Sequence, residues 1–162
     1  MSVWQMLFSF NGRLNRRPYW IATIAFMAVV IAITAVVAGV LYATSDPVAQ
    51  AEFLRTIRLW LMPLAMLLAY PEAAIFAKRL HDRNKPGALA ALFVIPSLIS
   101  SWLDPQGSLG GLGNGSLHLV YTAATIMTWV VGIWFTVELG FLRGSTGENR
   151  YGADPLAGAE VR

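Results

Sequence analysis

The sequence predicts an all-α membrane protein with four transmembrane helices and both termini in the cytoplasm. Of the 162 residues, 56% are hydrophobic and 13% are charged, whereas a soluble domain usually carries about 25% charged residues. The apolar residues fall into long runs separated by polar segments. These runs exceed the ~9–11 residues of a barrel strand, and open strands cannot cross lipid because their backbone groups would stay unpaired. The runs are therefore read as helices.

The first span is expected over residues 19–43. No charged residue occurs from Pro18 to Ser45, and about 20 apolar residues suffice to cross the hydrocarbon core. The run is longer than the apolar part of a cleaved signal peptide, about 7–15 residues, so we interpret it as a retained helix. Asn15 is expected to cap this helix, because Asn is favoured at that position.

The next two spans are expected over residues 59–77 and 87–103. Ser45-Asp46-Pro47 predicts the start of the second helix, since Asp is a good cap and Pro fits the first helical position. A kink is expected near Pro71. Lys85-Pro86-Gly87 predicts the turn that leads into the third span.

The fourth span is expected over residues 119–142, which are interrupted only by Glu138. A glycine-rich stretch over residues 104–116 precedes it and predicts a flexible loop. The four spans form a single membrane domain over residues 1–155. Residues 156–162 are expected to be a short flexible tail.

The distribution of Lys and Arg predicts the orientation in the membrane. Ten of the 12 basic residues lie in the N-terminal segment, the loop "KRLHDRNKPG" at residues 78–87 and the C-terminal tail, and the other two are Arg55 and Arg58 in the first loop. Cytoplasmic loops carry such an excess. Both termini and residues 78–87 are therefore expected in the cytoplasm. The net charge of +3 is explained by this topology, and no nucleic-acid partner is predicted.

Candidates for catalysis and metal binding are few. The absence of cysteine excludes thiolate metal sites and a cysteine nucleophile. His81 and Asp82 are adjacent, so they point about 100° apart on a helix, and the other histidine, His118, lies near the outer loop. Zinc normally needs three or four protein ligands. We predict no catalytic, cofactor or metal residues, and we interpret Asp82 as the i,i+3 partner of Arg79.

Two acidic residues, Glu72 and Glu138, lie inside apolar runs. Ionisable residues at membrane depth are costly and usually face the bundle interior. Glu72 shares a helix face with Arg79, seven positions further on, whereas Glu138 needs a partner from elsewhere. We expect a cytoplasmic ionic cluster that locks helix packing, with proton or ion translocation as the alternative. Its candidate members are Glu72, Arg79, Glu138 and one of Arg13, Arg16 and Arg17.

The segment "RGSTGENRYG", residues 143–152, suggests anion binding. It lacks the G-K-[ST] ending of a Walker sequence, but backbone amides rich in Gly and Ser can form a nest for an anion. Lipid phosphate is the anion available near a cytoplasmic helix end. The alternative is a turn that folds the tail under the bundle. Candidate headgroup or anion contacts are His81, Asp82, Arg143, Gly144, Gly147, Asn149 and Arg150.

Three motifs carry a family resemblance: "FNGRLNRRPYW", "AKRLHDRNKPG" and "RGSTGENRYGADP". Their order and the apolar spans between them resemble the bacterial domain of unknown function 805 family of small inner-membrane proteins, over nearly the whole chain. The resemblance implies a multi-pass protein of the bacterial inner (plasma) membrane and implies no known reaction.

Three classes of function follow. A structural or regulatory membrane module with a polar, basic cytoplasmic face leads, acting alone or with an unknown membrane partner. The second is a small transporter or channel that uses Glu72 and Glu138, as a homo-oligomer because four helices leave little interior room. The third is binding of anionic lipid headgroups, or chemistry on them, beside His81 and Asp82. The lipid bilayer is the expected partner, and no cofactor is expected.

Overall fold

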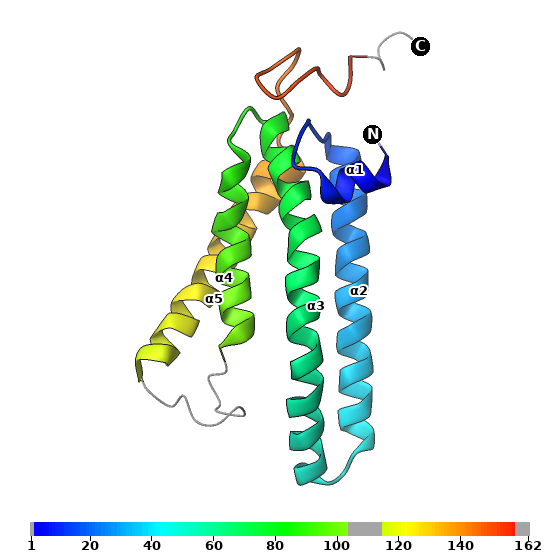
Figure 1. The fold of residues 1–162 in the computed structure, drawn as a ribbon, viewed down its shortest axis with the longest axis vertical. Coiled ribbons are helices and arrows are strands. Elements are labelled where there is room, and N and C mark those ends of the chain that lie inside the picture. Colours follow the sequence, from blue (N-terminus) through cyan, green and yellow to red (C-terminus); the bar gives the residue numbers. More distant parts are fainter. Residues whose placement is uncertain (1, 104–114, 158–162) are drawn as a thin grey trace.

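The computed structural model describes residues 2–103 and 115–157, and regular secondary structure in these residues is helical (Figure 1). An isolated antiparallel bridge joins Asn149 to Gly152. The loop predicted over residues 104–116 and the tail predicted over residues 156–162 lie mostly outside the described residues. The all-helical fold class is therefore confirmed for the part of the chain that is described.

The chain begins with a short helix that the sequence analysis did not predict, α1 (Val3–Phe8). Ser2 Oγ accepts a hydrogen bond from the Gln5 amide at 3.2 Å, and the Gln5 side chain accepts one from the Ser2 amide at 3.1 Å. This reciprocal pair is a capping box, whose sequence signal is Ser or Thr followed three residues later by Glu or Gln. The signal was present in the sequence and was missed.

Helices α2 (Arg16–Ala43) and α3 (Pro47–Asp82) form an antiparallel hairpin (Figure 1). The predicted start of α3 is confirmed, because the Asp46 side chain accepts a hydrogen bond from the Val48 amide at 3.0 Å. At 36 residues, α3 is about 54 Å long. It is thus longer than a hydrocarbon core of about 30 Å, and its last turns extend to the polar end of the molecule.

The third and fourth apolar runs form a second pair. A 3₁₀ turn, η1 (Gly87–Ala90), leads into α4 (Ala91–Trp102). Helix α5 (Gly115–Phe135) continues into a π-helical segment, η2 (Thr136–Phe141). Within the described residues α4 packs against both α5 and α3, and η2 packs against α2 and α3. The α4–α5 pair diverges from the α2–α3 hairpin toward the end opposite α1 (Figure 1).

Three of these helical segments are long and apolar enough to cross a membrane: Arg16–Ala43, Pro47–Asp82 and Gly115–Phe141. The apolar helical segment Gly87–Trp102 is shorter. Large apolar side chains point away from the protein along the helices, with Ile31 61%, Leu67 69% and Trp129 70% exposed. So much exposed apolar surface suits contact with lipid, because a soluble monomer rarely leaves large apolar patches in water.

The buried core lies at the end of the bundle that carries α1. Phe76 occupies its centre, with ring centroids 5.2 Å from Phe135 and 5.4 Å from Phe93, both edge-on. Edge-to-face pairs of this kind add about 0.5–1.5 kcal/mol each beyond burial. The core therefore holds α3, α4 and α5 together directly beneath the polar segments described next. Its buried members are Leu14, Tyr19, Ala22, Ile75, Phe76, Leu80, Ala90, Val131, Phe135 and Leu139.

Candidate functional site

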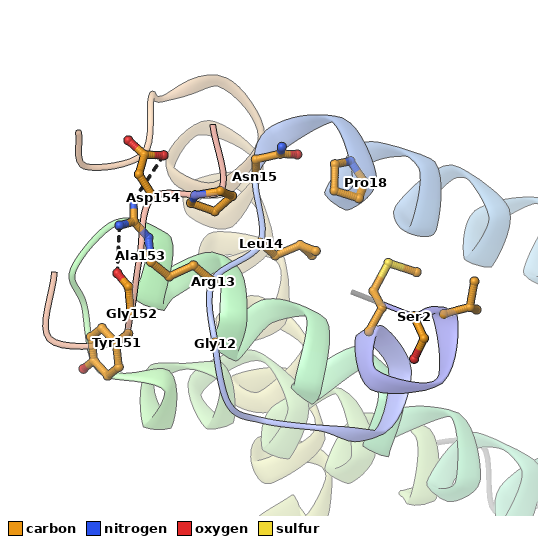
Figure 2. Close-up of a pocket in the computed structure, with 13 residues that line it drawn as sticks. Ser2, Gly12, Arg13, Leu14, Asn15, Pro18, Tyr151, Gly152, Ala153 and Asp154 are labelled. Carbon is orange, nitrogen blue, oxygen red and sulfur yellow. Dashed lines mark hydrogen bonds and ion pairs between the residues drawn. The ribbon is translucent and has the colours of Figure 1, made fainter. Parts of the chain in front are cut away.

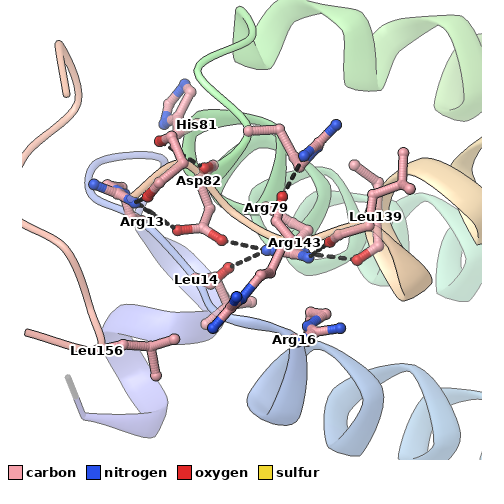
Figure 3. Close-up of polar contacts among 12 residues, drawn as sticks. Arg13, Leu14, Arg16, Arg79, His81, Asp82, Leu139, Arg143 and Leu156 are labelled. Carbon is pink, nitrogen blue, oxygen red and sulfur yellow. Dashed lines mark hydrogen bonds and ion pairs between the residues drawn. The ribbon is translucent and has the colours of Figure 1, made fainter. Parts of the chain in front are cut away.

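Three polar segments meet at the end of the bundle where α1 lies, and we call them the polar cap (residues 9–17, 78–87 and 143–155; Figures 2 and 3). The first leads into α2, the second ends α3, and the third follows η2. Each segment therefore adjoins an end of a membrane-length helix. Hydrogen bonds between the segments fix these three helix ends relative to one another.

The Asp82 carboxylate is at the centre of the polar cap (Figure 3). Arg13 Nε donates to Asp82 Oδ1 at 3.1 Å, and Arg79 Nη1 donates to Asp82 Oδ2. The three residues are nearly excluded from solvent, with Arg13 6%, Arg79 0% and Asp82 3% exposed. A buried charge is tolerated when it is paired and hydrogen-bonded, and here one carboxylate serves two guanidinium groups. The expected i,i+3 pair of Arg79 and Asp82 is present.

Arg13 ties the C-terminal segment to this centre. Its Nη1 donates to the carbonyl oxygens of Gly147 at 2.6 Å and Gly152 at 3.2 Å, and its Nη2 donates to that of Ser145 at 2.5 Å. Figure 2 shows the same guanidinium facing Gly152 and Asp154. The rigid planar fork of Arg suits several acceptors at once. One side chain therefore organises most of residues 145–152.

Arg79 ties η2 to the same centre. Its Nε donates to the Leu139 carbonyl oxygen at 2.6 Å, and its Nη2 donates to that of Leu142 at 2.7 Å. The last carbonyls of a helix have no partner inside the helix, and they carry its partial negative charge. Arg79 satisfies two carbonyls at the end of this helix from within the protein.

The backbone of the C-terminal segment approaches Asp82 closely at Gly144. A Cβ atom added there would lie 2.1 Å from Asp82 Oδ2 and 2.6 Å from its Cγ. The next residue, Ser145, donates to the Asp82 carbonyl oxygen through its amide at 2.7 Å and through its hydroxyl at 3.0 Å. Glycine is thus required at position 144 for steric reasons.

Lys78 holds α1 against α3. Its Nζ donates to the carbonyl oxygens of Gln5 at 3.2 Å and Met6 at 2.6 Å, and also to that of Ser9. The residue is fully buried. These acceptors are at the end of α1, where helix carbonyls lack partners, so the ammonium group acts as a cap supplied from another helix.

Glu138 is paired with the other basic residues of the middle segment. Arg83 Nε and Lys85 Nζ each lie 2.9 Å from Glu138 Oε1. The Lys85 ammonium also lies 5.6 Å from the centroid of the Trp134 ring, within the range of a cation–π interaction. The partner that Glu138 required is therefore supplied by the loop after α3, and not by Arg79 or the N-terminal arginines.

His81 lies beside the aromatic ring of Tyr151, with ring centroids 3.8 Å apart and planes 8° apart. Its Nδ1 lies 3.1 Å from the Gly12 carbonyl oxygen, and Asn149 Nδ2 donates to the His81 carbonyl at 3.0 Å. Arg150 donates to the Asn84 carbonyl at 3.0 Å. These residues connect the three segments. In the described residues no group of three or more His, Cys, Asp or Glu is arranged to hold a metal ion.

The remaining members of the predicted cluster lie at its edge. Arg16 is exposed and donates to the Phe141 carbonyl at 3.2 Å, and Arg17 is exposed. Glu72 is partly buried on α3 and forms no ion pair with any residue that the structure describes. The structure thus brings Arg13, Arg79 and Asp82 together, and it places Glu138 in a separate set of ion pairs.

Asp154 closes the C-terminal segment. Its Oδ2 accepts a hydrogen bond from the Gly147 amide and its Oδ1 one from the Leu156 amide, both at 2.9 Å. The bonds from Leu156 and Gly147, together with the nearby Arg13 guanidinium, hold the pKa of Asp154 below its ordinary value of 3.8. The carboxylate itself therefore occupies part of the nest predicted for an external anion.

Three cavities lie in or beside the polar cap. One of about 540 Å³ lies between α1 and residues 151–155 (Figure 2). The second, of about 440 Å³, is lined by Asn15, Arg16, Arg143 and residues 144–147, among others. A third, of about 370 Å³ and mostly apolar, lies beside His81 and Gly87. Neither predicted membrane carboxylate, Glu72 or Glu138, lines any of these three cavities.

A known sequence family has a model that matches most of this chain, including most of the polar cap. The family model described as "Protein of unknown function (DUF805)" matches residues 7–153, which includes most of all three segments. The chain belongs to this family. The predicted resemblance is thereby confirmed.

Relatives of this DUF805 protein support the same assignment. It is 28% identical over 162 residues to "Uncharacterized protein YiiR" of Escherichia coli K12, with 95% of this chain and 90% of the relative covered. It is 27% identical over 161 residues to "Inner membrane protein YhaI" of the same strain, with 98% and 96% covered. No solved structure matches the chain.

Sequence reasoning missed four residues that this DUF805 structure places in the polar cap: Lys78, Arg83, Lys85 and Asp154. Lys78, Arg83 and Lys85 lie in the motif "KRLHDRNKPG", and the sequence analysis used their charges only to predict the orientation in the membrane. Asp154 precedes a proline in "YGADP", and Asp is common in turns because its carboxylate accepts bonds from nearby amides. That local signal was available for Asp154, whereas nothing local indicates the carbonyl partners of Lys78.

Proposed function

We propose that this DUF805 protein is a four-span module of the bacterial inner membrane, with both termini and the polar cap in the cytoplasm. Three apolar helices of sufficient length, with the shorter segment Gly87–Trp102 as the fourth span, support this topology. The basic residues of the polar cap give the charge asymmetry of a cytoplasmic face. The relative named as an inner membrane protein supports the location.

Within this topology, the proposed role is structural: the polar cap joins the cytoplasmic ends of α2, α3 and η2 into one rigid platform. The buried Asp82 carboxylate, bound by Arg13 and Arg79, is the observation that carries this proposal. A catalytic acid or base must reach a substrate proton, yet this carboxylate is buried and already engaged on both oxygens. The His81 ring is likewise occupied by Tyr151 and Gly12.

The ion pairs of Glu138 also favour structure over transport. A translocating carboxylate needs an open route for the ion or proton, whereas Glu138 is held by Arg83 and Lys85 and lines none of the three cavities above. Holding three helix ends in register is a role that such pairs can perform. The rigid platform then presents exposed basic residues to the cytoplasmic headgroups or to a membrane partner.

Cysteine labelling tests the topology, because the natural chain contains no cysteine. Ala49→Cys lies near the α2–α3 turn and Glu148→Cys lies in the polar cap, and both positions are exposed. In intact cells a membrane-impermeant maleimide is expected to label the first variant only. The second is expected to react after the inner membrane is permeabilised. Labelling in the reverse order would refute the proposed orientation.

The structural role is tested by replacing Asp82. If the residue serves structure, Asp82→Asn lowers the amount of folded protein in the membrane and its melting temperature in detergent. A residue that serves only a reaction would leave both unchanged when it is replaced. Unchanged abundance and unchanged melting temperature would therefore contradict the proposal.

A further inference from the structure

The cavity of about 440 Å³ carries an inference beyond a structural role. It opens between the start of α2 and the segment that follows η2, and it is lined by three arginines and two aspartates. Figure 3 shows Arg16, Arg143 and Leu156 around the space beside the Asp82 ion pairs. The charges of these groups decide what the cavity can bind.

Both carboxylates of the cavity are already engaged. Asp82 is bound by Arg13 and Arg79, and Asp154 accepts the amides of Gly147 and Leu156. Arg79 is likewise occupied by Asp82 and by backbone carbonyls. The two aspartates therefore do not neutralise the remaining cations of the cavity.

Those remaining cations are Arg16 and Arg143. Arg16 gives one hydrogen bond to a backbone carbonyl, that of Phe141, and forms no ion pair with a described carboxylate. The Arg143 side chain is exposed and forms no hydrogen bond or ion pair with the residues that the structure describes. Two guanidinium groups on the wall of one cavity, without a counterion from the described chain, supply the charge and the hydrogen-bond donors that suit an anion.

Further donors at the same cavity favour an anion with several oxygens. Thr146, whose side chain carries a hydroxyl, is exposed and lines it. Asn15, at the N-cap of the 28-residue α2, makes no side-chain capping bond to the first amides of that helix. The positive end of the helix dipole adds to the field of the arginines. Leu156 and Ala157 supply an apolar rim.

We propose that this cavity binds a phosphate group through Arg16 and Arg143. Guanidinium groups match the oxygens of phosphate in pairs. Both arginines adjoin helix ends, where the headgroups of lipids lie in the proposed topology, so the phosphate belongs either to an anionic lipid or to a free phosphate compound. The candidate anion contacts at Arg143, Gly144 and Gly147 line this cavity, whereas His81, Asn149 and Arg150 do not.

Native mass spectrometry of the full-length protein in detergent tests the lipid source. The probes are dioleoyl-phosphatidylglycerol and dioleoyl-phosphatidylcholine, which share acyl chains and differ in net charge. The wild type is expected to retain more phosphatidylglycerol. Arg16→Gln and Arg143→Gln are each expected to weaken that retention about fivefold, the effect of losing one hydrogen-bonded contact to the phosphate.

Arg17→Gln is the matched control, because Arg17 is exposed on the same helix turn as Arg16 and does not line the cavity. It removes the same charge and is expected to leave lipid retention unchanged. Arg143→Lys is a second variant, expected to restore part of the binding lost in Arg143→Gln, since it keeps the charge without the planar fork. The helical content and melting temperature of each variant, without ligand, show that the fold is intact.

A thermal-shift titration with inorganic phosphate, against chloride at equal ionic strength, tests the other source. A rise in melting temperature that disappears in Arg16→Gln and Arg143→Gln, without any preference for phosphatidylglycerol, assigns the site to free phosphate compounds. The proposal is overturned if the wild type binds neither phosphatidylglycerol nor inorganic phosphate more strongly than Arg16→Gln and Arg143→Gln do. It is also overturned if Arg17→Gln weakens binding as much as Arg143→Gln, because the effect is then one of general surface charge.

Discussion

Arg13 and Asp82 lie 69 positions apart in the sequence, and their side chains form a buried ion pair with Arg13 Nη2 3.1 Å from Asp82 Oδ1. This pair joins the start of α2 to the end of α3. The same Arg13 also binds three carbonyls of the C-terminal segment, so all three segments of the polar cap depend on it. The pair therefore brings three motifs that lie far apart in the sequence into contact with one another.

The first prediction concerns the loss of the central carboxylate. Asp82→Asn leaves the guanidinium groups of Arg13 and Arg79 buried without their counterion. Removing one partner of a buried pair costs about 3–5 kcal/mol. We expect the free energy of unfolding in detergent to fall by that order, measured by thermal or denaturant unfolding.

Glu148→Gln is the control for this measurement. Glu148 is an exposed acidic residue of the same polar cap, and its replacement changes the net charge by the same amount. Its effect is expected to stay within about 0.5 kcal/mol, as for most surface substitutions. Equal effects of the two substitutions would show that net charge, and not the buried pair, sets the stability.

The second prediction concerns the close approach at Gly144. In Gly144→Ala the new methyl group meets the Asp82 carboxylate, which cannot move aside without leaving Arg13 and Arg79. Forcing extra volume into a packed site costs about 1–3 kcal/mol. We expect a lower melting temperature. We also expect the C-terminal segment to bind the rest of the polar cap less tightly, measured as faster proteolysis of residues 145–155.

Gly39→Ala provides the comparison for Gly144→Ala. Gly39 lies inside α2, and a Cβ atom there meets nothing within 4 Å. Alanine is favoured over glycine in a helix interior by about 1 kcal/mol, so this variant is expected to be neutral or slightly more stable. A loss at position 39 as large as that at position 144 would rule out the steric explanation.

The third prediction separates the two sets of ion pairs. Glu138 and Arg83 are in direct contact at 2.9 Å, so the effects of Glu138→Gln and Arg83→Gln should not add. We expect a coupling energy of about 0.5–1 kcal/mol in a double-mutant cycle, modest because Lys85 still holds Glu138. Glu138→Gln and Arg17→Gln are expected to be additive. Additivity in both cycles would mean that the ion pair makes no net contribution.

The fourth prediction concerns pH. Because the folded pKa of Asp154 is held below 3.8, the bonds that this carboxylate accepts stabilise the fold above the unfolded pKa. They are lost as pH falls through the lower folded value. We expect the amide signal of Gly147, followed by NMR in micelles, to titrate with a midpoint below 3.8 and the C-terminal segment to loosen in that range.

Asp154→Asn removes the titrating group and is expected to abolish this transition. Glu148→Gln, in the same segment, is expected to leave it unchanged. A midpoint at or above 3.8 in the wild type would show that the bonds from Gly147 and Leu156 do not favour the ionised carboxylate.

The elements that sequence predicted well depend on local signals. The start of α3 follows from the cap at Asp46 and the proline after it, and the extent of α2 follows from an uninterrupted apolar run. The π-helical segment η2 has no such signal, since the apolar run continues through it to Leu142. The expected span over residues 87–103 is helical but short, because the apolar run itself is bounded by Lys85 and Asp104.

By itself, the sequence determined the apolar runs, the start of α3, the family and the three polar motifs, since hydropathy and capping act over a few residues. Only the tertiary structure decided how the charges pair: Asp82 lies at the centre, Glu138 binds Arg83 and Lys85, and Glu72 stays apart. The physical reason is that each pairing between segments joins residues some 50–130 positions apart. Which groups meet there depends on the length and packing of whole helices, to which every residue between them contributes.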